Sequence, residues 1–368
     1  MSKVLESRLE IDLNALEENF KLLKSYLSSK TKMMGVVKAF AYGTDSVIIA
    51  KHLVKIGAQQ LAVAYIDEGV TLRKAGINVP ILVFYPQLKD VQSLIDYHLT
   101  PSVYNQYFLE GLTQELKLHD DVHTFGIHLK INTGLNRLGF DVNDLDSIFS
   151  QLQSEKKLKL VGLFSHLAAS GNPKEIDFSL QQIQNFEDAR QFFKNHLQYK
   201  FDAHICNSSG IINFPEAEYD MVRAGIALYG YGNNSEEHEI FKAVASLKTV
   251  IAQLRTIKQG ASVGYERKFI AQKTTKIATL PLGYADGISR IFGNGKAQVL
   301  IHYQKAPIVG NVCMDTLMVD VTGIQCEEGD EVEIFGKNHT VPDFDIEQQT
   351  IPYEIITRIS QRVTRVLI

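Results

Sequence analysis

The chain has 368 residues, of which 45% are apolar and 22% are charged, as is ordinary for a globular enzyme. Its 38 basic and 42 acidic residues give a net charge of -4. That balance excludes the basic surface which binding to nucleic acid or to an anionic membrane requires. The length favours two domains over one.

The N-terminal stretch MSKVLESRLEIDL has no apolar core of the length that a signal peptide needs. No later stretch approaches the roughly 18 apolar residues of a membrane span. Three widely spaced cysteines without a CxxC pair encode neither a disulfide framework nor a zinc site. We therefore expect a cytoplasmic protein that has no metal.

Short β-branched runs alternate with helix-period segments through the first two thirds of the chain. Eight such runs are predicted to be strands, at residues 35–39, 61–65, 81–85, 100–104, 126–132, 160–166, 203–207 and 220–226. Between them, apolar residues recur at three- and four-residue steps. The clearest amphipathic helix has its apolar face at Ile176, Leu180, Ile183, Phe186, Ala189 and Phe193.

Eight repeats of a buried strand and an amphipathic helix are typical of a (β/α)8 TIM-like barrel of the α/β class. An open doubly wound sheet is the weaker alternative, because no GxGxxG follows the first strand. After Tyr231 the segments become strand-like and are broken by Gly and Pro, which indicates a mainly-β C-terminal domain. We predict a barrel domain at residues 10–235 and a mainly-β domain that comprises residues 236–368 together with residues 1–9.

Barrel enzymes carry their working residues at the carboxyl ends of the strands and in the loops that follow. Residues with polar side chains or with polar backbone groups that could bind a ligand fall at those positions and are expected to converge on one mouth of the barrel. They are Lys38, Asn132, Arg137, His166, Asn207, Ser208, Arg223, Gly225 and Ile226.

Lys38, in VVKAFAYG, is the candidate nucleophile. A lysine at a strand end more often lays its stem over apolar surface. A partly desolvated lysine near other cations, however, has a lowered pKa and can form a Schiff base. It could attack a substrate carbonyl directly or hold pyridoxal phosphate (PLP). The segment NSSG (207–210) and the Gly225–Ile226 backbone offer hydrogen-bond donors for a phosphate, which favours PLP.

An ordered set of motifs spans nearly the whole chain and resembles the alanine racemase family. The motifs are RLEIDLNALEENF, VVKAFAYG, KINTGLNRLGF, GLFSHLAAS, HICNSSG, MVRAGIALYG, SVGYERKF, LPLGYADG, VGNVCMDTLMVDV and TIPYEIITRIS. The resemblance implies a PLP-dependent isomerase that interconverts L-alanine and D-alanine and supplies D-alanine for peptidoglycan. It also implies a homodimer with shared active sites and a small amino-acid substrate.

The resemblance also assigns roles to single residues. It implies two catalytic bases, Lys38 and Tyr265, on opposite faces of the substrate. It places the cofactor against Lys38, Tyr42, Arg137, His166, Asn207, Ser208, Arg223, Gly225, Ile226 and Tyr353. It places the substrate near Arg137, Met314, Asp315 and Tyr284, of which the last three come, like Tyr265, from the second subunit. Lys130 matches a position that is carbamylated in some members.

Two positions depart from the common family pattern. Phe40 stands where many members have Asn, so packing replaces a polar contact behind the cofactor. Asn132 stands where Asp is common, which removes an ion pair expected there.

Other functions stay open at this point. A racemase for serine or for a basic amino acid would share most of these motifs, because pocket volume sets that specificity. A related PLP decarboxylase would share the lysine but would need its own glycine-rich phosphate loop. A non-catalytic PLP-binding protein would not need the second domain that carries Tyr265.

Overall fold

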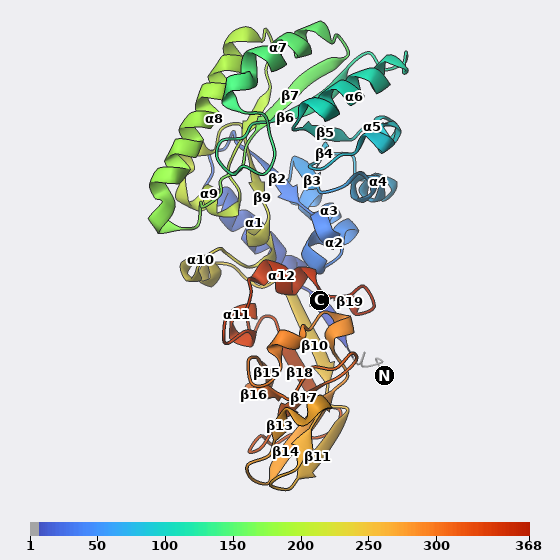
Figure 1. The fold of residues 1–368 in the computed structure, drawn as a ribbon, viewed down its shortest axis with the longest axis vertical. Helices are drawn as coiled ribbons and strands as arrows, with labels where there is room; N and C mark the ends of the chain where they lie inside the picture. The colour runs from blue at the N-terminus through green and yellow to red at the C-terminus, as the bar shows by residue number, and fades with distance from the viewer. Residues whose placement is uncertain (1–6) are drawn as a thin grey trace. The chain divides into compact units, whose positions relative to one another are not determined.

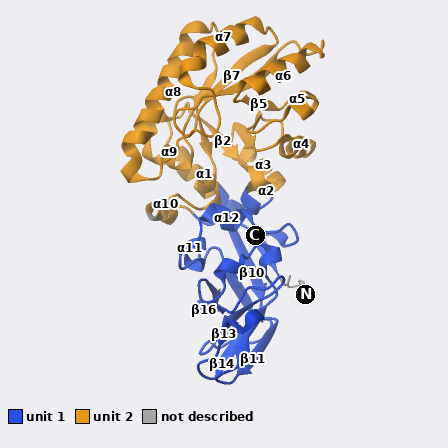
Figure 2. Cartoon of the chain, viewed as in Figure 1, with its two compact units in different colours: residues 1–16, 42–45, 242–368 blue, residues 17–41, 46–241 orange. Residues whose placement is uncertain are grey.

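A computed structural model describes residues 7–368 of the protein. Within them the chain forms two compact units, coloured separately in Figure 2. The barrel unit comprises residues 17–41 and 46–241, and the β unit comprises residues 42–45 and 242–368 with the N-terminal residues up to Leu16. The predicted assignment of residues 1–9 falls partly on residues 1–6, which lie outside the described part. The predicted boundary at residues 235 and 236 stays a prediction.

The barrel unit is built on a parallel sheet of eight strands in the order β8-β7-β6-β5-β4-β3-β2-β9 (Figure 1). The end strands β8 and β9 lie next to each other. The N–H of Arg223, in β9, donates to the carbonyl of Cys206, two residues after β8, at 3.0 Å. The sheet is therefore a nearly closed barrel, which confirms the predicted fold. The strands are β2 (Lys32–Val36), β3 (Gln60–Val63), β4 (Ile81–Val83), β5 (Thr100–Val103), β6 (Phe125–Lys130), β7 (Leu158–Phe164), β8 (Asp202–His204) and β9 (Met221–Ala224).

Helices follow the strands and surround the sheet in the barrel unit (Figure 1). They are α2 (Lys38–Gly43), α3 (Ser46–Lys55), α4 (Ile66–Lys74), α5 (Val91–Asp96), α6 (Gln106–Lys117), α7 (Leu145–Ser154), α8 (Ile176–His196), α9 (Ser208–Asn213) and α10 (Ser235–Ile240), preceded by α1 (Leu13–Ser25). Within residues 7–368, no helix combines the length and the apolar character needed to cross a membrane.

Helix α8 corrects one detail of the sequence prediction. Phe186, Ala189 and Phe193 are buried as expected, but Ile176 and Leu180 are exposed. The first turns of the helix bury Ser179 and Gln182 instead. Gln182 faces inward because its amide bonds to the loop after β7, an interaction that hydrophobic periodicity does not contain.

The β unit contains a nine-stranded sheet in the order β11-β14-β17-β16-β15-β18-β10-β1-β19. Its strands are β1 (Arg8–Ile11), β10 (Ala245–Val250), β11 (Gln253–Ile257), β14 (Thr275–Leu280), β15 (Gln298–Ile301), β16 (Gln304–Val309), β17 (Leu317–Asp320), β18 (Glu331–Phe335) and β19 (Thr364–Leu367). A separate hairpin joins β12 (Ser262–Val263) to β13 (Phe269–Ile270). Two short helices, α11 (Val341–Phe344) and α12 (Pro352–Thr357), complete the mainly-β C-terminal region that was predicted.

Single turns of 3-10 helix lie in the loops of both units. They are η1 (Leu88–Asp90), η2 (Val142–Asp144), η3 (Pro173–Glu175), η4 (Pro215–Ala217), η5 (Ile226–Tyr229), η6 (Tyr265–Arg267), η7 (Tyr284–Asp286) and η8 (Arg290–Phe292). Three of them begin at residues that were predicted to belong to the site, namely η5, η6 and η7.

Candidate active site

Lys38 lies two residues beyond the end of β2 and begins α2, whereas the sequence placed it at the strand end itself. The turn that follows is left-handed, with φ between 50° and 55° at Ala39, Phe40, Ala41 and Tyr42. An L-residue with a side chain loses about 1–2 kcal/mol in this conformation. Four consecutive residues in it make the backbone after Lys38 a strained segment that its surroundings must hold.

Glu68, in α4, holds the start of this left-handed turn. Its carboxylate accepts hydrogen bonds from the backbone N–H of Ala39 at 2.7 Å and from those of Ala64 at 2.6 Å and Tyr65 at 3.1 Å. The carboxylate thus joins the loop after β3 to the loop after β2. Sequence reasoning missed Glu68, although its place in the first turn of the helix after a barrel strand is a signal that could have found it.

Burial lowers the pKa of the Lys38 amine, and the nearby charge of Arg137 lowers it further. The carboxylate of Glu68 opposes this effect but does not cancel it. A lowered pKa increases the fraction of neutral amine, which is the nucleophilic form. The environment therefore suits Lys38 to Schiff-base chemistry, as the sequence predicted.

Arg223, in β9, is buried and holds the centre of a hydrogen-bond network. Its Nη1 donates to His204 Nδ1 at 2.6 Å and to the carbonyl of His204 at 3.1 Å. Its Nη2 donates to the carbonyls of Ser165 and Ile205 and to His166 Nδ1. In the described part of the chain these bonds occupy both Nη groups, so the Nε–H of Arg223 remains available for a bound group.

His204 and His128 continue this network into the barrel interior. His204 Nδ1 accepts from Arg223, so its proton is on Nε2 and is donated to His128 Nδ1 at 2.9 Å. Burial and the charge of Arg223 lower the pKa of His128 to about 3 and that of His204 well below its usual value. Both rings are therefore neutral acceptors that fix the orientation of the guanidinium. The sequence signal was a histidine inside each of two predicted strands, GIHLKIN and AHICN.

His166 follows β7 and accepts from Arg223 through Nδ1 at 3.1 Å. This bond assigns the ring proton to Nε2. Burial lowers the pKa of His166 well below its usual value, and four nearby cations lower it further. The order of their effects is Arg223, Lys130, Arg137 and Lys38. The structure thus brings together five of the predicted residues at the carboxyl end of the barrel.

Lys130, the last residue of β6, is 7% exposed, with its Nζ 4.7 Å from the ring centre of Phe164. Burial lowers the pKa of this amine to about 7, and the charges of Arg223 and Arg137 contribute. In residues 7–368, no ion pair joins Lys130 to a carboxylate. Without an anionic partner, the charged form of this buried amine is destabilised relative to the neutral form.

Asn207 and Ser208 form the start of α9, where an anion can be held. Asn207 Oδ1 caps the helix by accepting from the N–H of Gly210 at 3.0 Å. Ser208 Oγ accepts from the N–H of Gly225 at 3.0 Å and from that of Ala227 at 3.3 Å. The hydroxyl of Ser208 and the backbone at residues 225–227 thus lie together at one point of the rim. The predicted phosphate contacts of Gly225 and Ile226 stay a prediction.

Gln182 is a further residue that sequence reasoning missed. It is fully buried, and its amide donates to the carbonyl of His166 at 3.2 Å and to Thr133 Oγ1 at 3.3 Å. Its Oε1 accepts from the N–H of Ala168 at 2.8 Å. One side chain of α8 therefore connects the loops after β6 and β7, which carry Arg137 and His166.

The remaining predicted residues lie in the β unit. Tyr42 and Tyr353 are neighbours, with ring centres 6.1 Å apart. Burial raises the pKa of the Tyr42 phenol, which keeps it protonated and able to donate a hydrogen bond. Arg365 donates to the carbonyl of Gly43 at 2.8 Å and to that of Thr44 at 3.2 Å. The end of the left-handed turn is thus held within this unit.

Tyr265 begins η6, at the tip of the hairpin between β12 and β13, and 68% of its surface is exposed. Gly264, Glu266 and Arg267 around it have φ of 73°, 59° and 52°. Glu266 and Arg267 thus adopt the same strained left-handed conformation as the four residues after Lys38. Tyr265 belongs to the β unit, whereas Lys38 belongs to the barrel unit.

Tyr284, Met314 and Asp315 are held together in the β unit by backbone and ionic contacts. The N–H of Tyr284 donates to the carbonyl of Cys313 at 2.9 Å, and that of Ala285 donates to Met314 at 3.0 Å. Gly283 permits this approach, since a Cβ there would lie 2.4 Å from two carbonyl oxygens.

Arg362 links the two loops from a third segment. It donates to both carboxylate oxygens of the buried Asp286, at 2.6 and 3.0 Å, and to Asp315 Oδ1 at 2.7 Å. These ion pairs raise the pKa of its guanidinium. Arg362 was not among the predicted residues.

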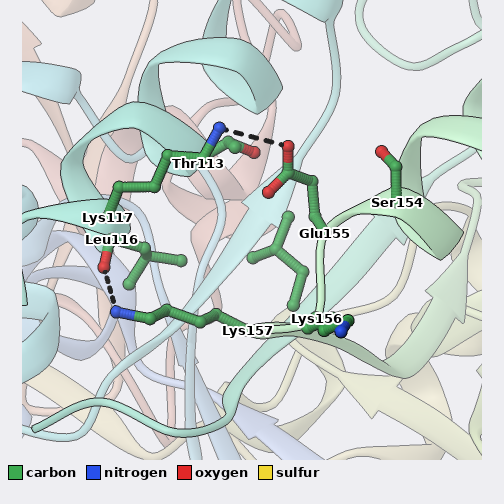
Figure 3. A pocket seen from close by; sticks show the side chains of 8 residues that line it. Thr113, Leu116, Lys117, Ser154, Glu155, Lys156 and Lys157 are labelled. Carbon is green, nitrogen blue, oxygen red and sulfur yellow. Dashed lines mark hydrogen bonds and ion pairs between the residues drawn. The ribbon is translucent and has the colours of Figure 1, made fainter. Parts of the chain in front are cut away.

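A pocket of about 230 Å³ on the outside of the barrel contains none of the predicted residues (Figure 3). Lys157 Nζ points to the end of α6 and donates to the carbonyl of Leu116 at 2.8 Å. Lys117 forms an ion pair with Glu155 at 3.5 Å. The ion pair balances the charges of Lys117 and Glu155, and Lys157 satisfies a carbonyl at the end of α6. No ligand is needed to explain these polar contacts.

The fold and the barrel rim together define a class of enzyme. A (β/α)8 barrel whose rim holds a lysine of lowered pKa among other cations, near a hydroxyl at a helix start, has the features of the barrel enzymes that use PLP.

Comparisons with known proteins agree. Residues 11–233 match the model of the alanine racemase N-terminal domain, and residues 244–367 match that of the alanine racemase C-terminal domain. The chain belongs to the alanine racemase family. Membership confirms the predicted enzyme class, an amino-acid racemase among the isomerases, and the predicted cofactor, PLP.

Individual relatives cover nearly all of the chain. Alanine racemase 2 of Caldanaerobacter subterraneus subsp. tengcongensis is 35% identical over 100% of this chain and 96% of its own length. The alanine racemase of Halothermothrix orenii is 38% identical over 97% of this chain and 95% of its own. The solved alanine racemase of Clostridium difficile 630 is 30% identical, with a TM-score of 0.92 over 99% of this chain and 96% of that one.

Proposed function

We propose that this protein racemises alanine with two bases, Lys38 and Tyr265, and that the D-alanine it makes supplies peptidoglycan. The observation that carries the proposal is the environment of Lys38, an amine of lowered pKa at a barrel rim that holds three further cations. The names of the relatives favour alanine over serine or a basic amino acid as the substrate.

The residues present fit PLP. Lys38 is the proposed point of attachment, and Tyr42, Asn207, Ser208, Gly225, Ile226 and Tyr353 are the proposed phosphate contacts. When bound, PLP acts as an electron sink that acidifies the Cα–H of the amino acid. The cationic rim suits a phosphate and a substrate carboxylate, and Arg137 is the proposed partner of that carboxylate.

Arg223 is the proposed partner of the pyridine nitrogen, through the Nε–H that the network leaves available. A guanidinium is always protonated at neutral pH and cannot give a proton away. Burial lowers the pKa of Arg223 to about 10, which still leaves it charged near neutrality. Arg223 therefore donates a hydrogen bond without transferring a proton, which limits the electron-withdrawing power of the ring and disfavours side reactions.

Two bases are needed because the substrate must lose a proton on one face and gain one on the other. Lys38 Nζ moves the proton on one face, and the Tyr265 phenol oxygen moves it on the other. A phenol works as a base near neutrality only when cations or hydrogen bonds stabilise its anion. His166, with its proton on Nε2, is the proposed donor to that oxygen, and Arg223 fixes the tautomer.

Exposure of the second base supports a homodimer. Tyr265 is 68% exposed in the single chain, and the proposed substrate contacts Tyr284 and Met314 are 42% and 53% exposed. A base must be enclosed to act on a bound substrate. We therefore propose that Tyr265, Tyr284, Met314 and Asp315 complete the site of a second subunit. Three free cysteines suit a reducing compartment, and we infer a cytoplasmic location.

Lys130 is proposed to be carbamylated. The neutral amine attacks carbon dioxide, forms an N–C bond and releases one proton, which leaves a carbamate anion. The lowered pKa favours this reaction because it increases the fraction of neutral amine near pH 7. The product would supply the negative charge that Lys130 lacks and would pair with Arg137, whose charge already acts on this amine.

The test is a chiral assay of the purified holoenzyme with L-alanine, L-serine and L-lysine, combined with Tyr265→Phe. We expect alanine to racemise fastest. Tyr265→Phe should retain PLP, seen as a lysine-bound absorption band that borohydride abolishes, and should lose racemisation by about 100-fold or more. Tyr303→Phe, which alters another exposed tyrosine of the β unit, is the matched control. A fully active Tyr265→Phe enzyme would disprove the two-base scheme.

A further inference from the structure

The loop that carries Arg137 leaves the barrel after β6 and returns to the same place. The N–H of Asn132 donates to the carbonyl of Phe140 at 2.8 Å, and the N–H of Phe140 donates to the carbonyl of Lys130 at 2.9 Å. Gly139, with φ of 120°, permits this closure, because a Cβ there would lie 2.7 Å from Asn132 N. The 132–140 loop is therefore a closed loop with Arg137 on its exposed side.

The side chain of Asn132 fills the interior of the 132–140 loop. Its Oδ1 accepts from the N–H of Asn136 at 3.0 Å and from that of Gly134 at 3.3 Å. Its Nδ2 donates to Asn136 Oδ1 and to Asp141 Oδ1, both at 3.0 Å. One amide thus supplies two acceptor bonds and two donor bonds, which an Asn side chain can make and a carboxylate cannot.

We propose that Asn132 is a positioning residue for Arg137, and that the amide is required because Asp141 faces it. The inference rests on the proposed function of Arg137 in binding the substrate carboxylate. Asn136, directly before Arg137, has φ of 55° and is held in this conformation by two bonds to the Asn132 side chain. The orientation of Arg137 therefore depends on Asn132, whose side chain binds the residue beside it.

The charges around the pair explain why an amide suits position 132 better than a carboxylate. Asp141 is a carboxylate that accepts from Asn132, and Asp144 lies three residues beyond it in η2. Lys130 and Arg137 are the cations nearest in the chain. A second carboxylate at 132 would face Asp141 at hydrogen-bond distance without a proton between them, which is unfavourable. The amide at position 132 is thus matched to Asp141 in this chain.

The test compares Asn132→Asp with the swapped variant Asn132→Asp/Asp141→Asn in the PLP-loaded, full-length enzyme. Repulsion at contact distance should lower the population of the ordered loop, so KM for alanine should rise about tenfold while kcat changes less than about twofold. The swapped variant restores an amide–carboxylate pair, with Asn136 turning its own amide to donate. Its KM should return to within about threefold of the wild type.

Hydrogen–deuterium exchange of the peptide that covers residues 132–140 gives a readout that does not depend on activity. Exchange should be faster in Asn132→Asp, with and without PLP, and should return to the wild-type rate in the swapped variant. Asn143→Asp is the matched control, because it makes the same chemical change at an exposed position of η2. It should leave both KM and exchange unchanged.

Two results would overturn the proposal. One is a wild-type KM and exchange rate in Asn132→Asp. The other is a swapped variant that is no better than Asn132→Asp, because a merely structural loss at position 132 would not be rescued by a change at 141. If the protein racemises no amino acid but the exchange pattern is as expected, the proposed function fails and the pairing stands.

Discussion

Lys130 combines burial with a positive neighbourhood, since Arg223 and Arg137 both act on its amine. The amine has an ordinary pKa of 10.5, and folding lowers it to about 7. Between these two values the unfolded chain binds a proton that the folded chain does not. The free energy of unfolding therefore rises with pH in this window, by about 1.4 kcal/mol per pH unit for one proton.

Replacing Lys130 by Met should remove this contribution. In degassed buffer without carbon dioxide, urea unfolding between pH 7 and 10 should give a flatter dependence on pH for Lys130→Met than for the wild type. Lys156→Met, which removes an exposed lysine, is the control and should keep the wild-type slope. Equal slopes in the wild type and Lys130→Met would show that the amine is not the group that titrates.

Carbon dioxide separates the free amine from the proposed carbamate. A carbamate has no amine proton to lose, so adding bicarbonate should flatten the slope of the wild type toward that of Lys130→Met. Labelled bicarbonate should give a protein carbamate signal in the carbon NMR spectrum of the wild type that is absent from Lys130→Met. A wild-type spectrum without this signal would disprove the proposed carbamylation and show that Lys130 is a free amine.

At the scale of elements, three neighbouring strands build the support beneath Arg223. His128 of β6 and His204 of β8 lie on either side of β7, in agreement with the rule that alternate strands fill one layer of a barrel. Phe164 of β7 stacks on His204, with ring centres 5.1 Å apart. Gly162 of β7 pairs with His128 and leaves room for its ring.

Gly162→Ala tests this layer. A Cβ at position 162 would lie 2.4 Å from the His128 ring, inside the contact distance. We expect the variant to lose about 1–3 kcal/mol of unfolding free energy, measured in urea. It should also bind PLP more weakly, because the displaced histidines no longer fix Arg223.

Gly126→Ala in β6 is the comparison for this prediction. Its Cβ would meet a Val161 side chain at 3.1 Å, which has room to adjust. A smaller loss than that of Gly162→Ala is therefore expected. If both variants lost the same stability and bound PLP equally well, the packing of His128 would not control the support of Arg223.

At the scale of the whole molecule, the sequence predicts the barrel well and the site in part. The eight strands follow from short β-branched runs, because strands of a parallel barrel are buried on both faces and are rich in such residues. Lys38, Arg137, His166 and Arg223 were predicted because strand ends carry the chemistry of this fold. In the structure the charges of Lys38, Arg137 and Arg223 all act on His166, so these four residues are neighbours, while their roles stay predictions.

The parts that were not predicted depend on tertiary contacts. The left-handed turn after Lys38 contains Ala, Phe, Ala and Tyr, none of which favours that conformation, so local propensity gives no signal. Glu68 and Gln182 act through the backbone of other loops. The inward face of α8 at Ser179 and Gln182 was missed for the same reason, because a polar side chain can be buried when a distant loop supplies its partner.

The division of proposed residues between a barrel unit and a β unit leads to the final prediction. Lys38→Ala and Tyr265→Phe should each inactivate the homodimer. If the site takes Lys38 from one subunit and Tyr265 from the other, a mixed dimer contains one site with both defects and one intact site. Mixed dimers, purified with two different affinity tags, should therefore regain about half of the wild-type activity per dimer.

A dimer of Lys38→Ala/Tyr265→Phe chains, tagged in the same way, is the control and should stay inactive. A site built within a single chain would give a mixed dimer in which both sites carry one defect, and no activity would return. Measuring D-alanine formation by the mixed dimer thus decides which subunit provides Tyr265. The same measurement tests why a base in this chain is exposed, because an exposed tyrosine becomes useful only when a second copy encloses it.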